Sequence, residues 1–233
     1  MIAIQKENRS VKRLPVISLI IIAINICVFI YLMLLPDDGG LVFFRYGAVP
    51  AAIMYHDVRE PLTPFLRIIF SLFLHSGFLH LLGNMLFFGI FCARVEDKIG
   101  HFRFLFFYFI CGFAAVLIYC LWVPHSMRPL VGASGAVSGI LGAYLFMFPL
   151  DKINVIPFAG RLIKKFRVPA FLVIGLWASV QFYGGLVSLF ITGTRNIAWF
   201  AHLGGFLIGL STIQFWIPRH SDSAEETNFK LDP

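Results

Sequence analysis

The chain has 233 residues, of which 59% are hydrophobic and only 13% are charged, and its mean hydropathy is +0.84. Soluble globular domains contain about 45–50% apolar and about 25% charged residues, so this composition excludes an ordinary soluble domain and indicates a membrane protein. The net charge of +7 requires no nucleic-acid partner, because basic residues beside membrane spans contact the anionic lipids of the bilayer.

Six segments are apolar and long enough to cross a hydrocarbon core of about 30 Å. The first follows a basic stretch, but its apolar run is too long for a signal peptide and no small-residue cleavage site follows, so we expect a retained signal anchor. The sequence therefore predicts an all-α membrane protein, a bundle of six transmembrane helices within residues 15–217. The predicted spans are 15–35, 73–93, 102–123, 131–149, 168–191 and 196–217.

The basic residues predict the orientation of these spans. Of the 19 Lys and Arg residues, 14 fall in the N-terminal tail, in the second and fourth connections between spans, or in the C-terminal tail. Because cytoplasmic loops carry an excess of Lys and Arg, both termini are predicted to be cytoplasmic. Residues 1–14 then form a cytoplasmic tail, and the polar residues 218–233 form a disordered one. The expected location is a bacterial cytoplasmic membrane.

The connection between the first two spans, residues 36–72, is too long for a simple turn. Loops of this length are usually functional or packed on the protein's own surface. Its apolar stretches, such as "LVFFRYGAVPAAIMY", favour a position in the outer membrane interface.

Carboxylates and cysteines give no sign of a metal or redox site. Asp and Glu are absent from the interiors of the predicted spans, with Glu96 and Asp97 just past the end of the second, which argues against a proton relay. The four cysteines show no CxxC spacing and are expected to pack as small apolar residues. The sequence predicts no metal and no cofactor. The cysteines are Cys27, Cys92, Cys111 and Cys120.

A small set of polar residues lies within the spans, where the simplest reading is hydrogen bonding between helices. The second, fourth and sixth spans all enter from the outer face, however. At 1.5 Å per residue, their His80, Ser134 and His202 lie about 5–11 Å below it, in one layer. The full set is His75, His80, Asn84, Ser134, Ser138, Gln181 and His202.

Small residues recur every four positions on the fourth and sixth spans, a spacing that lets two helix backbones approach closely. If these stripes face each other, the Ser134 hydroxyl and the His202 ring come within hydrogen-bond reach. Ile140, beside the first stripe, is expected to face lipid. The stripes are Gly135 with Gly139, Ser134 with Ser138 and Gly142, and Ala201 with Gly205 and Gly209.

These residue types suit nucleophilic catalysis. A serine hydroxyl needs a base to take its proton, and His202 is the base available to Ser134. The backbone N–H of Ser134 at a helix N-terminus, with the side chains of His80 and Asn84, could stabilise an oxyanion. No acid remains to orient the histidine, so the sequence predicts a dyad.

Three motifs occur in order on the second, fourth and sixth spans: "HSGFLHLLGNM", "GASG" and "AHLGG". Together with "VEDKIG" after the second span, they resemble the rhomboid family of intramembrane serine proteases over about residues 67–209. The resemblance implies an endopeptidase that cleaves single-span membrane proteins near the outer membrane face. It leaves the oligomeric state open.

The resemblance also implies roles for individual residues. Ser134 is the nucleophile and His202 the base, with His80 and Asn84 as oxyanion donors. The fifth span and the cap loop at 192–196 form a lateral gate for the substrate. Supporting residues are His75, Gly132 in the turn, Gly135, Gly205 in the histidine helix and Arg67 in the first loop.

One position departs from the family pattern. Many relatives carry an aromatic ring four residues after the serine, stacked under the histidine, and here that residue is Ser138. Trp199 or Phe200 is therefore expected to hold the imidazole in its place.

Alternative functions are weighed against the same residues. An inactive rhomboid-like protein that binds membrane proteins for quality control should lack the serine or the histidine, and both are present. A transporter or channel should show intramembrane charges or paired discontinuous helices. Other intramembrane proteases need HExxH or paired aspartates, which are missing. Tight helix packing without activity is the remaining alternative.

Overall fold

The computed structural model describes residues 2–6, 13–37, 39–55, 63–156, 166–191 and 198–218. The cap loop at 192–196, residues 219–233 of the C-terminal tail and residues 1 and 7–12 of the N-terminal tail lie outside this range. The predictions made for those three segments are therefore not addressed by the structure.

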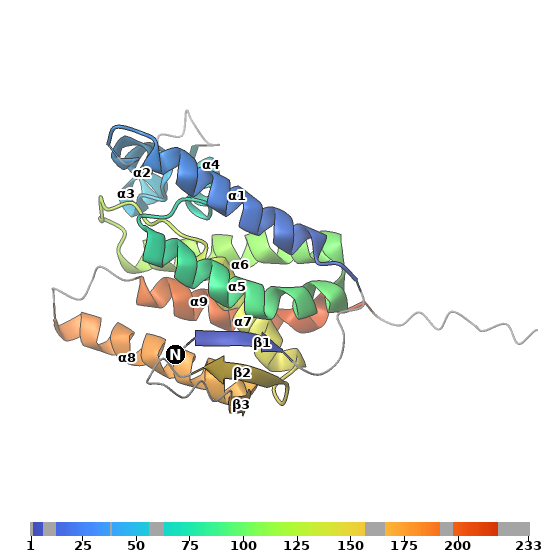
Figure 1. The fold of residues 1–233 in the computed structure, drawn as a ribbon. Helices are drawn as coiled ribbons and strands as arrows, with labels where there is room; N and C mark the ends of the chain where they lie inside the picture. Colours follow the sequence, from blue (N-terminus) through green and yellow to red (C-terminus); the bar gives the residue numbers. More distant parts are fainter. Residues whose placement is uncertain are drawn as a thin grey trace, which may run out of the picture.

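Six of the described helices, each of 14 or more residues, form a bundle. Successive helices of this bundle run in opposite directions (Figure 1). Four of them are 18 to 22 residues long and apolar enough to cross a membrane. The other two, α7 and α9, have 14 residues each, about 21 Å of helix, which is shorter than a hydrocarbon core. The all-α membrane bundle is confirmed, but within the described residues four of the six predicted spans reach spanning length. The helices are α1 (Val16–Met33), α5 (Phe78–Ile99), α6 (His101–Trp122), α7 (Ser134–Met147), α8 (Ala170–Phe190) and α9 (Trp199–Thr212).

The short helix α7 lies at the centre of the bundle, packed against α5, α6 and α9. Its residues from Gly135 to Tyr144 are all buried. A helix that is apolar on every side is stable when other helices enclose it, and it then need not match the membrane thickness. The expectation that Ile140 faces lipid is wrong for this reason, since its side chain is fully buried.

The long connection after α1 folds into three short helices. These are α2 (Gly40–Tyr46), α3 (Pro50–Met54) and α4 (Thr63–Ser71). Both α3 and α4 pack against α6, and α2 packs against α4. Leu41, Phe44 and Phe65 remain more than half exposed, as expected for a segment beside lipid.

A small antiparallel sheet was not predicted from the sequence. Its strands β1 (Ile2–Lys6), β2 (Lys152–Ile156) and β3 (Phe166–Pro169) pair in the order β1-β2-β3. The pairing joins the N-terminal segment to the connection between α7 and α8. These are two of the segments that the basic residues assign to the cytoplasmic face, so the pairing agrees with that orientation.

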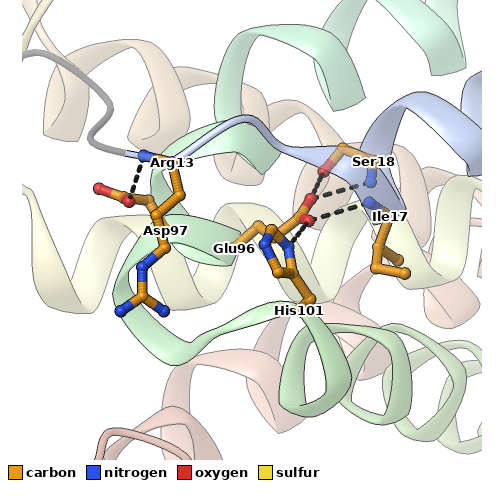
Figure 2. Close-up of polar contacts among 6 residues, drawn as sticks. All are labelled: Arg13, Ile17, Ser18, Glu96, Asp97 and His101. Atoms are coloured by element: carbon orange, nitrogen blue, oxygen red, sulfur yellow. Dashed lines mark hydrogen bonds and ion pairs between the residues drawn. The ribbon is translucent and has the colours of Figure 1, made fainter.

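Helix α5 continues six residues past the predicted end of the second span, and this extension buries Glu96 completely. Figure 2 shows its carboxylate at the first turn of α1. The carboxylate accepts hydrogen bonds from the backbone N–H groups of Ile17 and Ser18, at 2.9 and 2.8 Å, and from the Ser18 hydroxyl. It also contacts the ring of His101. The charge thus satisfies N–H groups that have no acceptor inside their own helix.

A second set of polar contacts joins α5 and α7 to Asp151, the residue directly before β2. Asp151 lies 3.0 Å from the Arg94 guanidinium and accepts a hydrogen bond of 2.8 Å from the Tyr144 hydroxyl. Both contacts lie at the end of the bundle opposite to Ser134, the first residue of α7. They fix the positions of α5 and α7 relative to each other without involving the polar residues at the other end.

Candidate active site

The loop before α7 is held by backbone hydrogen bonds that place Ser134 at the helix N-terminus. Leu130 and Ala48 exchange two of these bonds, at 2.9 and 3.0 Å, and the N–H of Gly132 donates to the Ser71 carbonyl at 2.8 Å. Gly132 has a φ of +120°, a backbone conformation that residues other than glycine rarely adopt. The turn therefore depends on glycine at this position.

Arg67 on α4 holds the segment that pairs with this loop. Its guanidinium donates to the carbonyls of Phe44 and Gly47, at 3.0 and 3.5 Å. Gly47 directly precedes Ala48, which pairs with the loop before Ser134. Both of these hydrogen bonds are made to backbone carbonyls, in keeping with the structural role that the family resemblance implies.

The stripes of small residues on α7 and α9 face each other. A Cβ atom on Gly205 would overlap the carbonyl oxygen of Gly135, and one on Gly209 would overlap that of Gly139. The two backbones therefore touch with no side chain between them, as close helix packing through glycine requires. This contact sets the distance between the first turns of α7 and α9.

Ser134 and His202 meet beside this contact. His202 Nε2 lies 2.8 Å from the Ser134 Oγ, within the normal range for a hydrogen bond. The serine comes from the first turn of α7 and the histidine from the first turn of α9. Residues 68 positions apart in the sequence thus bring a hydroxyl group and an imidazole nitrogen within hydrogen-bond distance, which is the geometry that nucleophilic catalysis by a serine requires.

Asn84 and His80 on α5 point toward the same region. Asn84 is buried, and its Nδ2 has no acceptor among the described residues. A Cβ atom on Gly132 would lie 2.7 Å from His80 Nε2 and 3.5 Å from Asn84 Nδ2. A side chain at position 132 would therefore clash with His80, and both polar groups line the same cavity as Ser134.

His75 lies behind these donors and is fully buried. Its Nε2 faces the backbone N–H of Ala133 at 3.5 Å, and its ring packs edge-on against His80 with 5.1 Å between centroids. The second nitrogen of His80 contacts the Ser76 hydroxyl at 3.2 Å. His75 thus supports both the loop before Ser134 and the ring of His80.

A cavity of about 600 Å³ brings these groups together. Both polar and apolar side chains line it. This combination is typical of a site that binds an apolar segment and acts on one polar bond. The polar groups include Ser134, His202, His80 and Asn84, and the apolar ones include Val137, Leu141 and Trp177.

The second nitrogen of the imidazole has a partner that the sequence reasoning did not assign. His202 Nδ1 lies 2.8 Å from Oε1 of Gln181 on α8. The expectation that Trp199 or Phe200 holds this ring is wrong. Phe200 packs on a tryptophan of α6, and the Trp199 ring lies against Gly184. Gln181 was noted as a polar residue within a span, but sequence alone could not place it beside the histidine.

Ser138 occupies the place of the aromatic ring found in many relatives. Its hydroxyl donates to the carbonyl of Ser134 at 2.6 Å, within its own helix. The side chain is buried and lines the cavity one turn below Ser134. Of the two serines in "GASGAVSG", Ser134 is therefore the one that contacts the histidine.

Comparisons with known proteins show which family the chain resembles. The Rhomboid domain family matches residues 63–219, about two thirds of the chain. Rhomboid protein 1, mitochondrial, of Saccharomyces cerevisiae is 32% identical over 157 residues, which cover 65% of this chain and 42% of the yeast protein. Rhomboid-like protease 3 of Toxoplasma gondii is 28% identical over 150 residues, covering 64% of this chain and 51% of that protein.

The relatives also include a protein named as inactive. Inactive rhomboid protein 1 of Drosophila melanogaster is 38% identical over 79 residues, which cover 34% of this chain and 5% of that protein. The chain matches about half or less of the length of each of these three relatives. The sequence similarity and the names of the relatives therefore do not decide between an active protease and an inactive relative.

Proposed function

The chain belongs to the rhomboid family, and we propose that it is a serine endopeptidase that cleaves transmembrane segments inside the membrane. The observation that carries this proposal is the hydrogen bond of 2.8 Å between Ser134 Oγ and His202 Nε2 in the wall of the cavity. A serine hydroxyl beside an imidazole nitrogen that can take its proton is the arrangement required for acyl transfer.

In the proposed reaction, His202 Nε2 takes the proton of the Ser134 hydroxyl as Oγ attacks the carbonyl carbon of the scissile peptide bond. The tetrahedral intermediate collapses when the same imidazole gives the proton to the departing amine. Water, deprotonated by His202, then attacks the acyl-enzyme and releases the second product. The cycle returns both side chains to their starting state.

Three donors are proposed to stabilise the oxyanion of the intermediate. The first N–H groups of a helix have no acceptor inside it, and Ser134 is the first residue of α7. The Nδ2 of Asn84 is buried and has no acceptor among the described residues, which is unfavourable until an oxygen binds there. His80 lines the same cavity as Asn84 and Ser134. Preorganised donors of this kind act on the charge that develops during the reaction.

The proposed substrates are single-span membrane proteins. A peptide bond inside a helix is hidden by its own hydrogen bonds, so the segment must unwind before it reaches Ser134. Small or helix-destabilising residues near the outer face would make this easier. The apolar part of the cavity wall suits the side chains of such a segment.

The cellular membrane that contains the protein is a separate question. The comparisons support a multi-pass membrane protein. The relatives described above are eukaryotic, and the yeast protein is named mitochondrial. They give no support to the predicted bacterial cytoplasmic membrane, which stays a prediction from the sequence.

The proposal is tested with purified protein in lipid vesicles that contain a single-span reporter. We expect wild type to cleave the reporter and Ser134→Ala to show no cleavage, with thermal unfolding unchanged. Ser138→Ala is the matched control, because Ser138 lies on the same helix and bonds only to a backbone carbonyl in the hydrogen bonds described. It should keep activity within about threefold of wild type, since Ala fits a buried helix position well.

Two outcomes would contradict the proposal. Cleavage by Ser134→Ala at the wild-type rate would exclude the serine mechanism. A wild-type protein that binds the reporter without cleaving it, and does not react with a serine-directed phosphonate, would favour the alternative of an inactive binding protein.

A further inference from the structure

Gln181 is a buried amide on a helix that is otherwise almost entirely apolar. It lies near the middle of α8, and only 8% of its surface is exposed. Its neighbours Val180 and Phe182 are more than half exposed. Burying an amide among apolar groups is unfavourable unless the amide is hydrogen-bonded, so a Gln on the inner face of α8 requires a partner there.

The partner is the imidazole of His202. Gln181 Oε1 lies 2.8 Å from Nδ1, and Ser134 Oγ lies 2.8 Å from Nε2. Both ring nitrogens are thus engaged, by groups from two other helices. Two hydrogen bonds on opposite edges of one ring define its plane and its rotation about the side-chain bonds.

The chemistry of the amide oxygen also decides which nitrogen carries the hydrogen. An amide oxygen only accepts hydrogen bonds, so Nδ1 must be the donor, and neutral Nε2 keeps a lone pair toward the Ser134 hydroxyl. If the amide were reversed, its NH₂ would donate to Nδ1. Nε2 would then carry the hydrogen and could not take the serine proton.

We infer that Gln181 is a positioning residue that holds His202 in the tautomer and orientation needed for general-base catalysis. The inference rests on the proposed function and extends it, because the sequence predicted a dyad without an orienting group. The constellation then spans three helices: α7 provides the nucleophile, α9 the base and α8 the group that orients the base.

A neutral amide orients the ring without adding charge, and this makes the inference testable by pH. The other titratable groups on the cavity wall are His80 from α5, Arg128 from the segment before α7 and the Tyr119 hydroxyl from α6. No carboxylate is present among the described residues that line the cavity. A carboxylate at position 181 would keep an acceptor oxygen but would favour the protonated imidazole.

The experiment compares Gln181→Leu, Gln181→Glu and the control Ser179→Leu, which replaces an exposed polar residue on the same helix. For each, kcat and KM for the reporter are measured in vesicles across pH, together with thermal unfolding and the rate of phosphonate labelling. Gln181→Leu should lower kcat by about 10- to 10³-fold, because the base loses its orientation. It should change KM by less than about threefold, because the cavity persists.

Gln181→Glu should recover kcat to within about tenfold of wild type. The acidic limb of its kcat/KM profile should move to higher pH, because protonated His202 cannot act as a base. The shift shows that position 181 contacts the imidazole, and a purely structural role for Gln181 would not make the recovery of kcat depend on an acceptor oxygen at this position. The control Ser179→Leu should match wild type in kcat, in KM and in pH profile.

Either of two results would overturn the inference while the proposed function stands: wild-type kcat in Gln181→Leu, or an unmoved pH profile in Gln181→Glu. The second test holds even if the leucine variant does not fold. A wild-type protein that neither cleaves the reporter nor reacts with the phosphonate, by contrast, would overturn the proposed function and this inference with it.

Discussion

Gly205 on α9 lies directly against the backbone of Gly135 on α7, where a Cβ atom would overlap the Gly135 carbonyl oxygen. Gly135 follows Ser134 in the chain, and Gly205 lies one turn after His202. One of the direct backbone contacts between the two helices is therefore next to the hydrogen bond between serine and histidine. The separation of the helices at these glycines sets the distance between the two reacting groups.

Gly205→Ala should lower both activity and stability. The added methyl group forces the backbones apart, and a displacement near 1 Å at the reacting pair can cost about 10²-fold in rate. Overpacking a tight contact also costs about 1–3 kcal/mol of stability. Cleavage of the reporter and thermal unfolding measure the two effects.

The matched control for this change is Gly89→Ala on α5, where no atom lies within 4 Å of the added Cβ. It should change neither quantity much, because Ala is favoured over Gly in a helix. Wild-type cleavage and unfolding in Gly205→Ala would show that the glycine contact does not set the distance between Ser134 and His202.

Asn84→Ala should separate oxyanion stabilisation from activation of the nucleophile. Losing one oxyanion donor typically costs about 10² to 10³ in rate, so kcat should fall by this factor while slow turnover remains. The variant should still react with a serine-directed phosphonate, because Ser134 and His202 keep their hydrogen bond. Met85→Ala, at the neighbouring half-buried position, should keep the wild-type kcat. Loss of labelling in a folded Asn84→Ala protein would instead assign Asn84 to activation of the serine.

The meeting of Ser134 and His202 could be predicted from the sequence for a physical reason. The small residues repeat at the period of a helix face, and only such a repeat allows two backbones to touch. The polar residues also begin three helices that run in the same direction, so they had to fall in one layer. Both arguments use spacing along the chain, which the sequence states directly.

What could not be predicted depends on rotation and on the surroundings of each helix. Helix α7 is apolar on all sides, so no periodic pattern showed that Ile140 faces the protein, or that this short helix is enclosed. Gln181 lies on a helix that runs opposite to α7 and α9, and its contact with His202 depends on how α8 is rotated. A hydropathy window likewise ended the second span before Glu96, because it scores a buried carboxylate as if it were exposed to lipid.

Glu96→Gln should lower stability with little effect on the chemistry. The amide keeps one acceptor oxygen but turns an NH₂ group toward the N–H group of either Ile17 or Ser18, and that N–H group then loses its acceptor. We expect a loss of about 1–3 kcal/mol in thermal unfolding experiments. Glu96 is 12 residues from Asn84 along α5, about 18 Å of helix, so kcat of the folded protein should stay near wild type. Lys98→Gln, at an exposed position two residues further on, should leave unfolding unchanged. Equal unfolding of the two variants would mean that the buried carboxylate does not stabilise the contact between α1 and α5.

Arg67 tests whether the long first loop helps to position the nucleophile. Its guanidinium donates to the carbonyls of Phe44 and Gly47, next to Ala48, and Ala48 pairs with Leu130 in the loop before Ser134. If this series of hydrogen bonds holds the turn, loosening its first member should reach the active site.

Arg67→Leu should therefore lower the unfolding temperature and reduce kcat by about tenfold, because a serine held less firmly spends less time in the reactive geometry. Arg67→Lys should fall between this variant and wild type, since an ammonium group can donate to carbonyls but lacks the planar fork of guanidinium. The control Arg45→Leu removes the same charge from an exposed side chain on α2 and should leave kcat unchanged. The cation–π contact of Arg45 with Tyr46, which this change also removes, is worth about 0.5–1 kcal/mol. A lower unfolding temperature with wild-type kcat in Arg67→Leu would show that Arg67 stabilises the loop without positioning Ser134. Equal changes of unfolding temperature and kcat in Arg67→Leu and Arg45→Leu would mean that both changes result from the lost charge.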